Sequence, residues 1–213
     1  MKALVITMID EPESVRVAER CIESGKKFGV NVEIKPAITP KDNPVKILNE
    51  DLGIDASVFP TEYSRLEPVV SCFLSHYFIW AEAKEETLVL EHDAVFYDRI
   101  DEIEYNDFVS IGKPSFGRYN EMNQKGTYPL FSKVGGYLPG AHAYMFKPHF
   151  VQNLLYQASR QPAPTDVFLN SHNFPTMQEC WPHPVHCEDS FTFVQKEKGC
   201  TAKHNYNDSY KIY

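Results

Sequence analysis

The chain of 213 residues is acidic, with 21 Lys and Arg against 29 Asp and Glu and a formal net charge of −8. This balance argues against a protein that wraps nucleic acid, because such binding depends on neutralising phosphates. The hydrophobic content of 43% and the aromatic content of 13% argue against disorder and supply a core for one domain over residues 1–213. No apolar run approaches the roughly 20 residues of a membrane span.

The first residues predict a strand rather than an export signal. Met1–Asp10 contains too short an apolar stretch for a signal peptide, and no small-residue cleavage site follows it. The cysteines are odd in number and irregularly spaced, at Cys21, Cys72, Cys180, Cys187 and Cys200. Without an export signal, we expect reduced thiols in a cytoplasmic protein.

The opening elements predict a β-α-β unit. Ala3–Thr7 is a short apolar run rich in β-branched residues, as in a buried strand. Pro12 opens a helix whose apolar positions recur at helical spacing up to a stop at Gly29. Val30–Ile34 alternates again and predicts a second strand. Two strands joined through a helix favour a parallel sheet and an α/β fold.

The clearest predicted helix runs from Pro68 to about Glu86, because its apolar positions keep the 3.6-residue period. His76 lies near the buried edge of this helix. The next apolar run, Thr87–Leu90, predicts a strand that leads directly into the triplet Glu91-His92-Asp93.

The second half of the chain predicts shorter elements around a long loop. Residues 113–140 are rich in Gly, Pro, Tyr and Asn without a clear period, which is typical of a functional loop or lid. The other expected elements are helices at Val45–Leu52, Pro148–Arg160 and Asp166–Ser171, and strands at Asp107–Gly112 and Gly140–Phe146.

Acidic residues directly after a buried strand indicate a cation site. Glu91 and Asp93 stand two residues apart at the carboxyl end of the predicted strand, the edge where open α/β sheets bind ligands. Two such carboxylates can face the same side and hold Mg²⁺ or Mn²⁺, which prefer oxygen ligands and share their shell with a diphosphate. A solvated strand-to-turn transition is the alternative for this triplet taken alone.

The block from Ser71 to Val95 resembles glycosyltransferase family 25, the lipopolysaccharide-type and collagen galactosyltransferases. The family pattern is G-C-x-x-S-H, three residues, W, a short spacer, and an apolar strand that ends in E-D-D. The matching residues here are Cys72, Ser75, His76, Trp80, Glu91 and Asp93. Ser71 replaces the glycine, and His92 replaces the middle acid, so one negative charge fewer is available to a cation.

Other segments resemble the family more loosely. Val5–Thr7 and the later Arg16 are similar to its opening strand and Arg-containing helix. Gly140–Met145 is similar to its G-x-x-A-Y strand, and Pro164–Leu169 to its P-x-D-x-x-L motif. Pro184–Ser190 is similar to its closing P…S segment, so the resemblance covers most of the chain in the same order.

The resemblance implies a GT-A-like (Rossmann-like) fold, with a mixed, mainly parallel sheet flanked by helices. Residues 1–112 would bind the nucleotide sugar, and residues 113–213 would form the loop-rich acceptor side. The implied reaction is the inverting transfer of a hexose, typically galactose, from a UDP-sugar to a glycan or other hydroxyl acceptor. Such a reaction needs a carboxylate base for the acceptor proton and a divalent cation, Mn²⁺ or Mg²⁺, for the departing diphosphate.

The resemblance also implies which residues hold the cation and act as the base. Asp93, assisted by Glu91, would hold the cation, with His186 as a further ligand. Asp166 would be the base, and a helix N-cap is the alternative role for it. Asp189 is the reserve candidate for the base.

Donor contacts are expected at the end of the first predicted strand, in the helix that follows it, and in the block from Ser71 to Val95. The expected residues are Thr7, Arg16, Ser75, His76 and Glu91. For His76 the alternative is a core histidine, and the functional role is to orient a metal-binding carboxylate. For Arg16 the alternative is a solvated helix residue.

Three other interpretations compete with the transferase. Four zinc-competent ligands stand within eight residues, at Cys180, His183, His186 and Cys187. A catalytically degenerate family member would bind a carbohydrate or a partner, as the two departures from the family pattern favour. A metal-dependent phosphate-ester hydrolase would use the carboxylates of the acidic triplet together with histidines.

Overall fold

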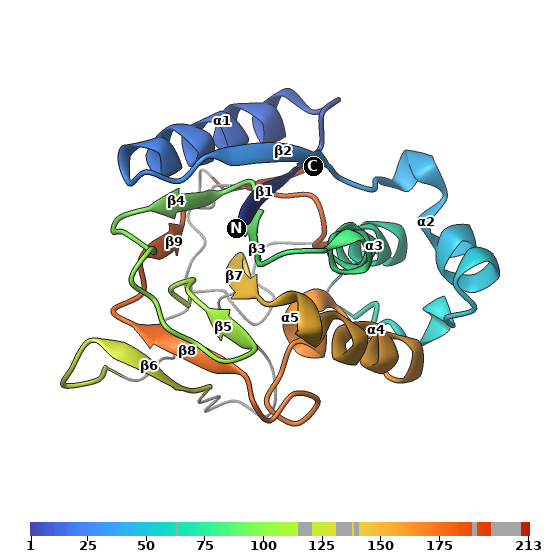
Figure 1. Cartoon of the computed structure of the whole chain (residues 1–213). Helices are drawn as coiled ribbons and strands as arrows, with labels where there is room; N and C mark the ends of the chain where they lie inside the picture. The colour runs from blue at the N-terminus through green and yellow to red at the C-terminus, as the bar shows by residue number, and fades with distance from the viewer. Residues whose placement is uncertain (63, 115–120, 131–137, 139–140, 189–190, 197–209) are drawn as a thin grey trace.

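A seven-stranded sheet organises the computed structural model of this chain (Figure 1). The structure describes residues 1–62, 64–114, 121–130, 138, 141–188, 191–196 and 210–213. The strand order is β2-β1-β3-β7-β5-β8-β6. The strands of this sheet are β1 (Lys2–Thr7), β2 (Val32–Pro36), β3 (Thr87–Glu91), β5 (Phe108–Ser110), β6 (Gly126–Pro129), β7 (Ala143–Phe146) and β8 (Gln178–Trp181).

The strand directions confirm the predicted fold class. β1 pairs in parallel with β2 and with β3, and β5 pairs in parallel with β8. Only β7 and β6, among the described strands of this sheet, run against the others. The fold is therefore mixed α/β, with a mainly parallel sheet flanked by helices.

The predicted β-α-β opening is confirmed, except that its second strand starts later than predicted. Helix α1 (Pro12–Lys27) connects β1 to β2. Gly29 has a φ of +81°, a left-handed conformation that glycine adopts without strain. The Val30 N–H still bonds the Gly25 carbonyl at 2.9 Å. This bond keeps Val30 at the helix end, so β2 begins two residues later than the alternation predicts.

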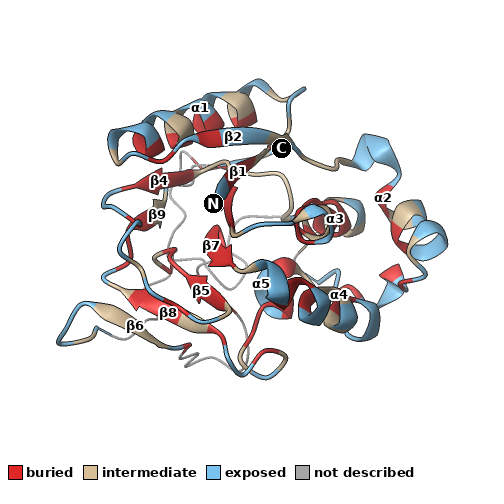
Figure 2. Ribbon diagram, viewed as in Figure 1, coloured by how far each residue is buried: buried red, intermediate tan, exposed pale blue. Residues whose placement is uncertain are grey.

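The sheet buries a different cluster on each face. α1 covers one face, and α3 (Leu66–Glu82) and α4 (Val151–Arg160) cover the other (Figure 1). Side chains alternate along β1, so Leu4 packs in the α3 cluster while Val5 packs in the α1 cluster. Figure 2 shows the central strands β5 and β7 buried, and β6 and the outer surface of α1 more exposed.

Helix α3 is the central element of the larger cluster, as its apolar period predicts. Phe73 and Trp80 are fully buried on it. The indole of Trp80 stacks on the ring of Phe168, with centroids 5.2 Å apart, and the ring of Phe73 meets Phe168 edge to face. Burial of each such side chain contributes roughly 1.5–3 kcal/mol to folding. These contacts fix α3 against α5 (Thr165–Phe168).

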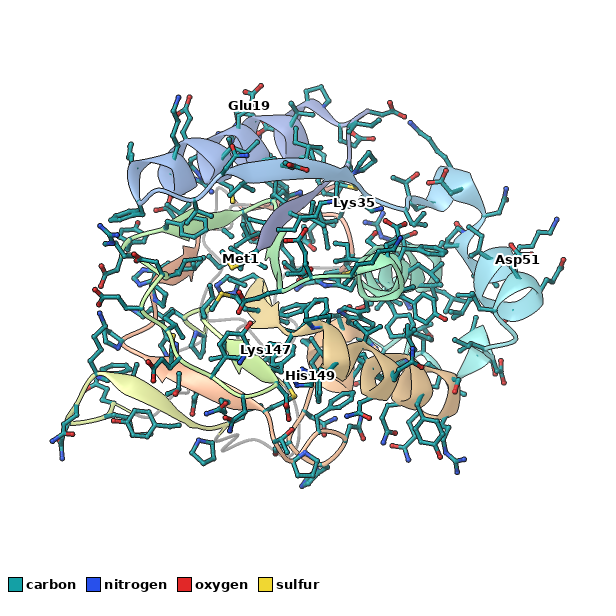
Figure 3. The ribbon with its side chains drawn as sticks, in the orientation of Figure 1. Met1, Glu19, Lys35, Asp51, Lys147 and His149 are labelled. Atoms are coloured by element: carbon teal, nitrogen blue, oxygen red, sulfur yellow. The ribbon has the colours of Figure 1, made fainter. Side chains whose placement is uncertain are left out.

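Short helical turns complete the layer. They are η1 (Pro40–Asp42), α2 (Pro44–Lys46), η2 (Ile47–Asp51), η3 (Ala56–Val58), η4 (Pro148–Phe150) and α5 (Thr165–Phe168). The helix predicted over Val45–Leu52 is confirmed as α2 and η2. Figure 3 shows Glu19 on the outer surface of α1 and Asp51 on η2, both pointing into solvent.

The sequence interpretation of residues 113–140 as a loop is wrong in part. Residues 126–129 form β6, which pairs antiparallel with β8; residues 115–120, 131–137 and 139–140 lie outside the described part of the chain. β8 and β9 (Val185–Cys187) were also not predicted. These strands have only three or four residues, so their pairing partners and not their own pattern define them.

Two small sheets lie beside the main one. β4 (Ala94–Phe96) pairs antiparallel with β9, directly after the acidic triplet. β10 (Phe191–Thr192) pairs in parallel with β11 (Lys211–Ile212). In the described ranges, no helix combines the length and the apolar character that crossing a membrane requires.

Candidate functional site

A cluster of polar side chains gathers where β3 ends. Cys72 and His76 stand four residues apart on α3 and therefore share a face of that helix. Glu91 is the last residue of β3. One donor atom each of Cys72, His76 and Glu91 lies within 4.8 Å of the others. Three residues that the family resemblance singles out thus meet at one point.

A hydrogen-bond chain holds His76 from behind. The indole N–H of Trp80 donates to the Tyr144 hydroxyl at 2.8 Å, and this hydroxyl lies 2.8 Å from His76 Nδ1. An indole can only donate, so the Tyr144 proton is free to go to Nδ1. A neutral His76 then carries its own proton on Nε2, which lies 3.5 Å from Glu91 Oε1. His76 is fully buried, and its ring orients the carboxylate of Glu91.

Glu91 is kept ionised by its histidine neighbours. Burial acts to raise its pKa, but the interactions of the carboxylate with the nearby imidazoles of His76, His142 and His92 outweigh burial and hold the pKa of Glu91 below its usual range. The side chain is 35% exposed. A charged carboxylate therefore stands at the end of β3, partly open to solvent.

Asp166 lies close enough to feel that charge. Asp166 is exposed at the surface. Its pKa is raised to about 6, first by the protein atoms that surround the carboxyl group and then by the negative charge of Glu91. The interpretation of Asp166 as a helix N-cap is wrong. The N-cap position of α5 is Pro164, without a side-chain cap, and Asp166 Oδ1 accepts from the N–H of its neighbour Val167 at 3.0 Å.

Asp93 follows β3, and one oxygen of its carboxylate is buried without a hydrogen-bond partner among the described residues. The Cys187 thiol donates to Asp93 Oδ2 at 3.0 Å, and the N–H of Glu188 donates to the Asp93 carbonyl at 3.1 Å. Asp93 Oδ1 is buried and has no hydrogen-bond partner among the described residues. A buried carboxylate oxygen without a partner is costly, and a hard cation such as Mg²⁺ or Mn²⁺ would satisfy it. The donor chemistry of Asp93 therefore fits the implied metal.

His186 is placed away from the cation candidates. Successive side chains of a strand point to opposite faces, and Cys187 already points to Asp93. His186 points the other way and stacks on Tyr97, with ring centroids 4.3 Å apart. Across the described chain, Glu91, Asp93 and His186 do not bring three donor atoms within 4.8 Å.

The expected donor-binding residues differ in what they do. Thr7 and Ser75 are buried, and both secure the backbone after β2: the Thr7 carbonyl accepts from Ala37 N–H at 2.9 Å, and the Ser75 hydroxyl accepts from Ile38 N–H at 2.9 Å. Arg16 is exposed on α1 and pairs with Glu13 at 2.7 Å, as expected for a solvated helix residue.

Two further positions bear on the expected site. Asp189 lies outside the described residues. His92, which replaces the middle acid of the family triplet, bonds the Ser14 hydroxyl through Nδ1 at 2.7 Å, and that hydroxyl accepts from Met8 N–H at 2.9 Å. His92 thus ties the end of β3 to the start of α1 and replaces an acidic side chain with a structural one.

The four residues of the alternative zinc site do not meet. Cys180 Sγ faces the Pro182 carbonyl at 3.7 Å, while Cys187 bonds Asp93. His186 and Cys187 are strand neighbours with side chains on opposite faces. All four residues belong to the described chain, and their donor atoms do not form a metal-competent group there. No described cysteine is in a disulfide, and Cys200 lies outside the described residues.

Sequence reasoning missed the groups that support the cluster from a distance. Tyr144 belongs to β7 and reaches His76 across 68 positions of sequence, and His142 beside it is buried and lowers the pKa of Glu91. Cys187 reaches Asp93 across 94 positions. The sequence places His142 and Tyr144 in a strand similar to that of the family and Cys187 among zinc-competent residues, but neither signal names a partner.

A scan against protein-family models finds no match, and a search of curated proteins finds none either. Among solved structures, the chain is similar to the glycosyltransferase GlyE of Streptococcus pneumoniae TIGR4, with a TM-score of 0.43 and 13% identity, covering 84% of this chain and 44% of that one. The apo form of GlyE gives a TM-score of 0.37 at 13% identity, covering 75% and 39%. The chain thus spans less than half the length of these structures, and a likeness this distant carries no statement about function.

Proposed function

We propose that the chain is a glycosyltransferase that moves a hexose, galactose, from a UDP-sugar to the hydroxyl group of a glycan or other acceptor. The transfer inverts the configuration of the anomeric carbon. The observation that carries this proposal is the gathering of three carboxylates near the carboxyl end of β3. Glu91 stays ionised there, Asp93 keeps an oxygen without a partner, and Asp166 has a raised pKa. The family resemblance of Ser71–Val95 supplies the reaction class.

Asp166 has the properties of the base. An inverting transfer requires a group that takes the proton of the acceptor hydroxyl as its oxygen attacks the sugar carbon. With a pKa of about 6, Asp166 is mainly ionised at neutral pH and a stronger base than an ordinary aspartate. Carboxylates whose pKa values are pushed in opposite directions, as for Asp166 and Glu91, are typical of sites in which each has a separate task.

Asp93 is the residue that would hold Mn²⁺ or Mg²⁺. When bound, such a cation supplies positive charge against the negative charge of the departing diphosphate. Cys187 fixes one carboxylate oxygen of Asp93 and leaves the other available. Glu91 adds negative charge next to this position and is itself oriented by His76.

A second candidate function is binding without transfer. It is favoured by the place of His92, which bonds Ser14 where the family pattern has an acid. It is also favoured by Thr7 and Ser75, whose contacts are with backbone. A degenerate member of this kind would still take up a carbohydrate or a partner, but Asp166 would have no proton to remove.

Two measurements test the proposal. UDP with Mn²⁺ should raise the melting temperature of the full chain more than either alone, since donor and cation share one site. UDP-galactose with a panel of sugar acceptors should then yield a product heavier by one hexose in mass spectrometry, and Asp166→Asn should abolish this product. Asp51→Asn, an exposed carboxylate on η2, is the matched control. If UDP and Mn²⁺ bind but no sugar is transferred, the transferase proposal is wrong and the second candidate function, binding without transfer, takes its place.

A further inference from the structure

The cluster at the end of β3 contains a mixed donor set, and the proposed transferase gives no role to its thiol, that of Cys72. Cys72 contributes a thiol, His76 an imidazole nitrogen and Glu91 a carboxylate, from two elements that the core holds together. We propose that Cys72, His76 and Glu91 form a binding site for a transition-metal ion of the zinc class. This site is separate from the hard-cation position at Asp93, and its existence does not depend on glycosyl transfer.

The spacing of the donors suits such an ion. Zinc sites take thiolate, imidazole and carboxylate ligands at about 2.0–2.3 Å, which places tetrahedral ligands about 3.6 Å apart. The three donor atoms here lie within 4.8 Å of one another without an ion. Small side-chain rotations close the difference, because Cys72 and Glu91 are only partly buried and can adjust. Three protein ligands leave one position open, as in zinc sites that bind an exogenous group.

The strongest independent observation is the state of His76. Its ring is fully buried, and Nε2 makes no hydrogen bond of acceptable geometry with any described residue; its nearest neighbour is Glu91 Oε1 at 3.5 Å. Its other nitrogen is held by Tyr144 at 2.8 Å. Metal-binding histidines are typically fixed in this way through the nitrogen that does not bind the metal. The nitrogen aimed into the cluster therefore has no hydrogen-bond partner to give up, and it becomes a ligand once its proton moves to Nδ1.

Metal binding requires a defined change of protons. The Cys72 thiol loses its proton to solvent as sulfur binds the ion, and Glu91 is already ionised. Neutral His76 moves its proton from Nε2 to Nδ1, which then donates to the Tyr144 oxygen. That oxygen has two lone pairs and accepts from both His76 and Trp80. One proton is released for each ion bound.

The donor set separates this site from the cation of the transferase. Mg²⁺ and Mn²⁺ prefer oxygen ligands, whereas a thiolate with an imidazole selects zinc-class ions. Asp93 has its thiol contact with Cys187 and does not belong to the group of Cys72, His76 and Glu91. The Asp93 position and the site of Cys72, His76 and Glu91 therefore bind different ions.

Cobalt(II) is the probe that tests the site, with the full chain freed of metal. One equivalent of Co²⁺ should give the visible bands of tetrahedral coordination and a near-ultraviolet band from thiolate to metal, and Zn²⁺ should remove both. Cys72→Ser should remove the thiolate band and weaken Zn²⁺ binding by more than about 100-fold, since loss of an outer partner alone costs about 10- to 100-fold. Saturating Mg²⁺ should leave the Co²⁺ spectrum unchanged.

Cys180→Ser is the matched control, because Cys180 is another buried thiol that lies outside the cluster. It should bind Co²⁺ and Zn²⁺ as the wild type does. The proposal is overturned if Co²⁺ gives no thiolate band, if Cys72→Ser binds Zn²⁺ as tightly as the wild type, or if Cys180→Ser loses the site instead. None of these readouts uses activity, so a failure here leaves the transferase proposal intact, and the reverse also holds.

Discussion

The Tyr144 hydroxyl is the partner of two buried polar groups behind the site. It accepts from Trp80 and bonds His76 Nδ1, both at 2.8 Å, and all three side chains are fully buried. Tyr144→Phe keeps the ring and its stack on Phe108, with centroids 4.9 Å apart, so packing changes little. It leaves the indole N–H and His76 Nδ1 without partners. Each orphaned buried group costs about 1–3 kcal/mol, so the variant should lose about 2–6 kcal/mol of unfolding free energy.

Chemical denaturation followed by intrinsic fluorescence measures this loss, and the melting temperature should fall by at least about 4 °C. Tyr156→Phe is the control, because Tyr156 is 59% exposed and its variant should stay within about 0.5 kcal/mol of the wild type. Nitrogen NMR of the His76 ring should show the proton on Nε2 in the wild type. A Tyr144→Phe variant as stable as Tyr156→Phe, or a wild-type His76 protonated on Nδ1, would refute the hydrogen-bond chain.

Three other substitutions separate the roles assigned at the site. Asp166→Asn should lower kcat far more than it raises KM. In the wild type the rate should rise with pH through an apparent pKa near 6, and a rate that does not change between pH 5 and 7 would contradict the assignment of Asp166 as the base. The pKa of Asp166 is higher in the folded than in the unfolded chain, so ionisation of this residue destabilises the fold as the pH rises. In thermal scans, Asp166→Asn should therefore melt at a higher temperature than the wild type at about pH 7.5 and at the same temperature at about pH 3.5. Asp93→Asn should remove the extra thermal stabilisation that Mn²⁺ adds to UDP, and its persistence would move the cation elsewhere. Arg16→Ala removes an exposed pair with Glu13, so calorimetry should find UDP affinity unchanged and stability within about 1 kcal/mol, whereas a tenfold loss of affinity would return Arg16 to the donor site.

Elements with strong local patterns could be predicted from the sequence. The apolar period of α3 and the apolar run of β3 each specify their structure almost alone, and the placement of Glu91 after β3 follows from them. β6 and β8 could not be found, because a strand of four residues is defined by its neighbour in the sheet. Gly126 and Pro129 in β6 even argue against a strand, and Pro129 is tolerated there because β6 lies at the edge.

The candidate site was predictable in its members more than in its arrangement. His76, Glu91 and Asp166 were expected from the motif resemblance, and the structure places them near one another. Arg16 and His186 were expected beside them, but helix exposure and strand alternation direct their side chains elsewhere. Contacts such as that of Cys187 with Asp93 join distant parts of the chain, and no local pattern encodes them.

The position of β7 has a consequence for how the chain can be synthesised and divided. β7 lies between β3 and β5 and bonds both, so the middle of the sheet is closed by residues 143–146. Until those residues are available, β3 presents an unpaired edge with an apolar centre, Leu88–Leu90, which is a template for aggregation. Residues 1–112 contain the β-α-β unit and the acidic triplet, yet a fragment ending there would expose this edge permanently. The nascent chain must therefore keep β3 protected while residues 92–146 are synthesised, and the two halves of the molecule mature together.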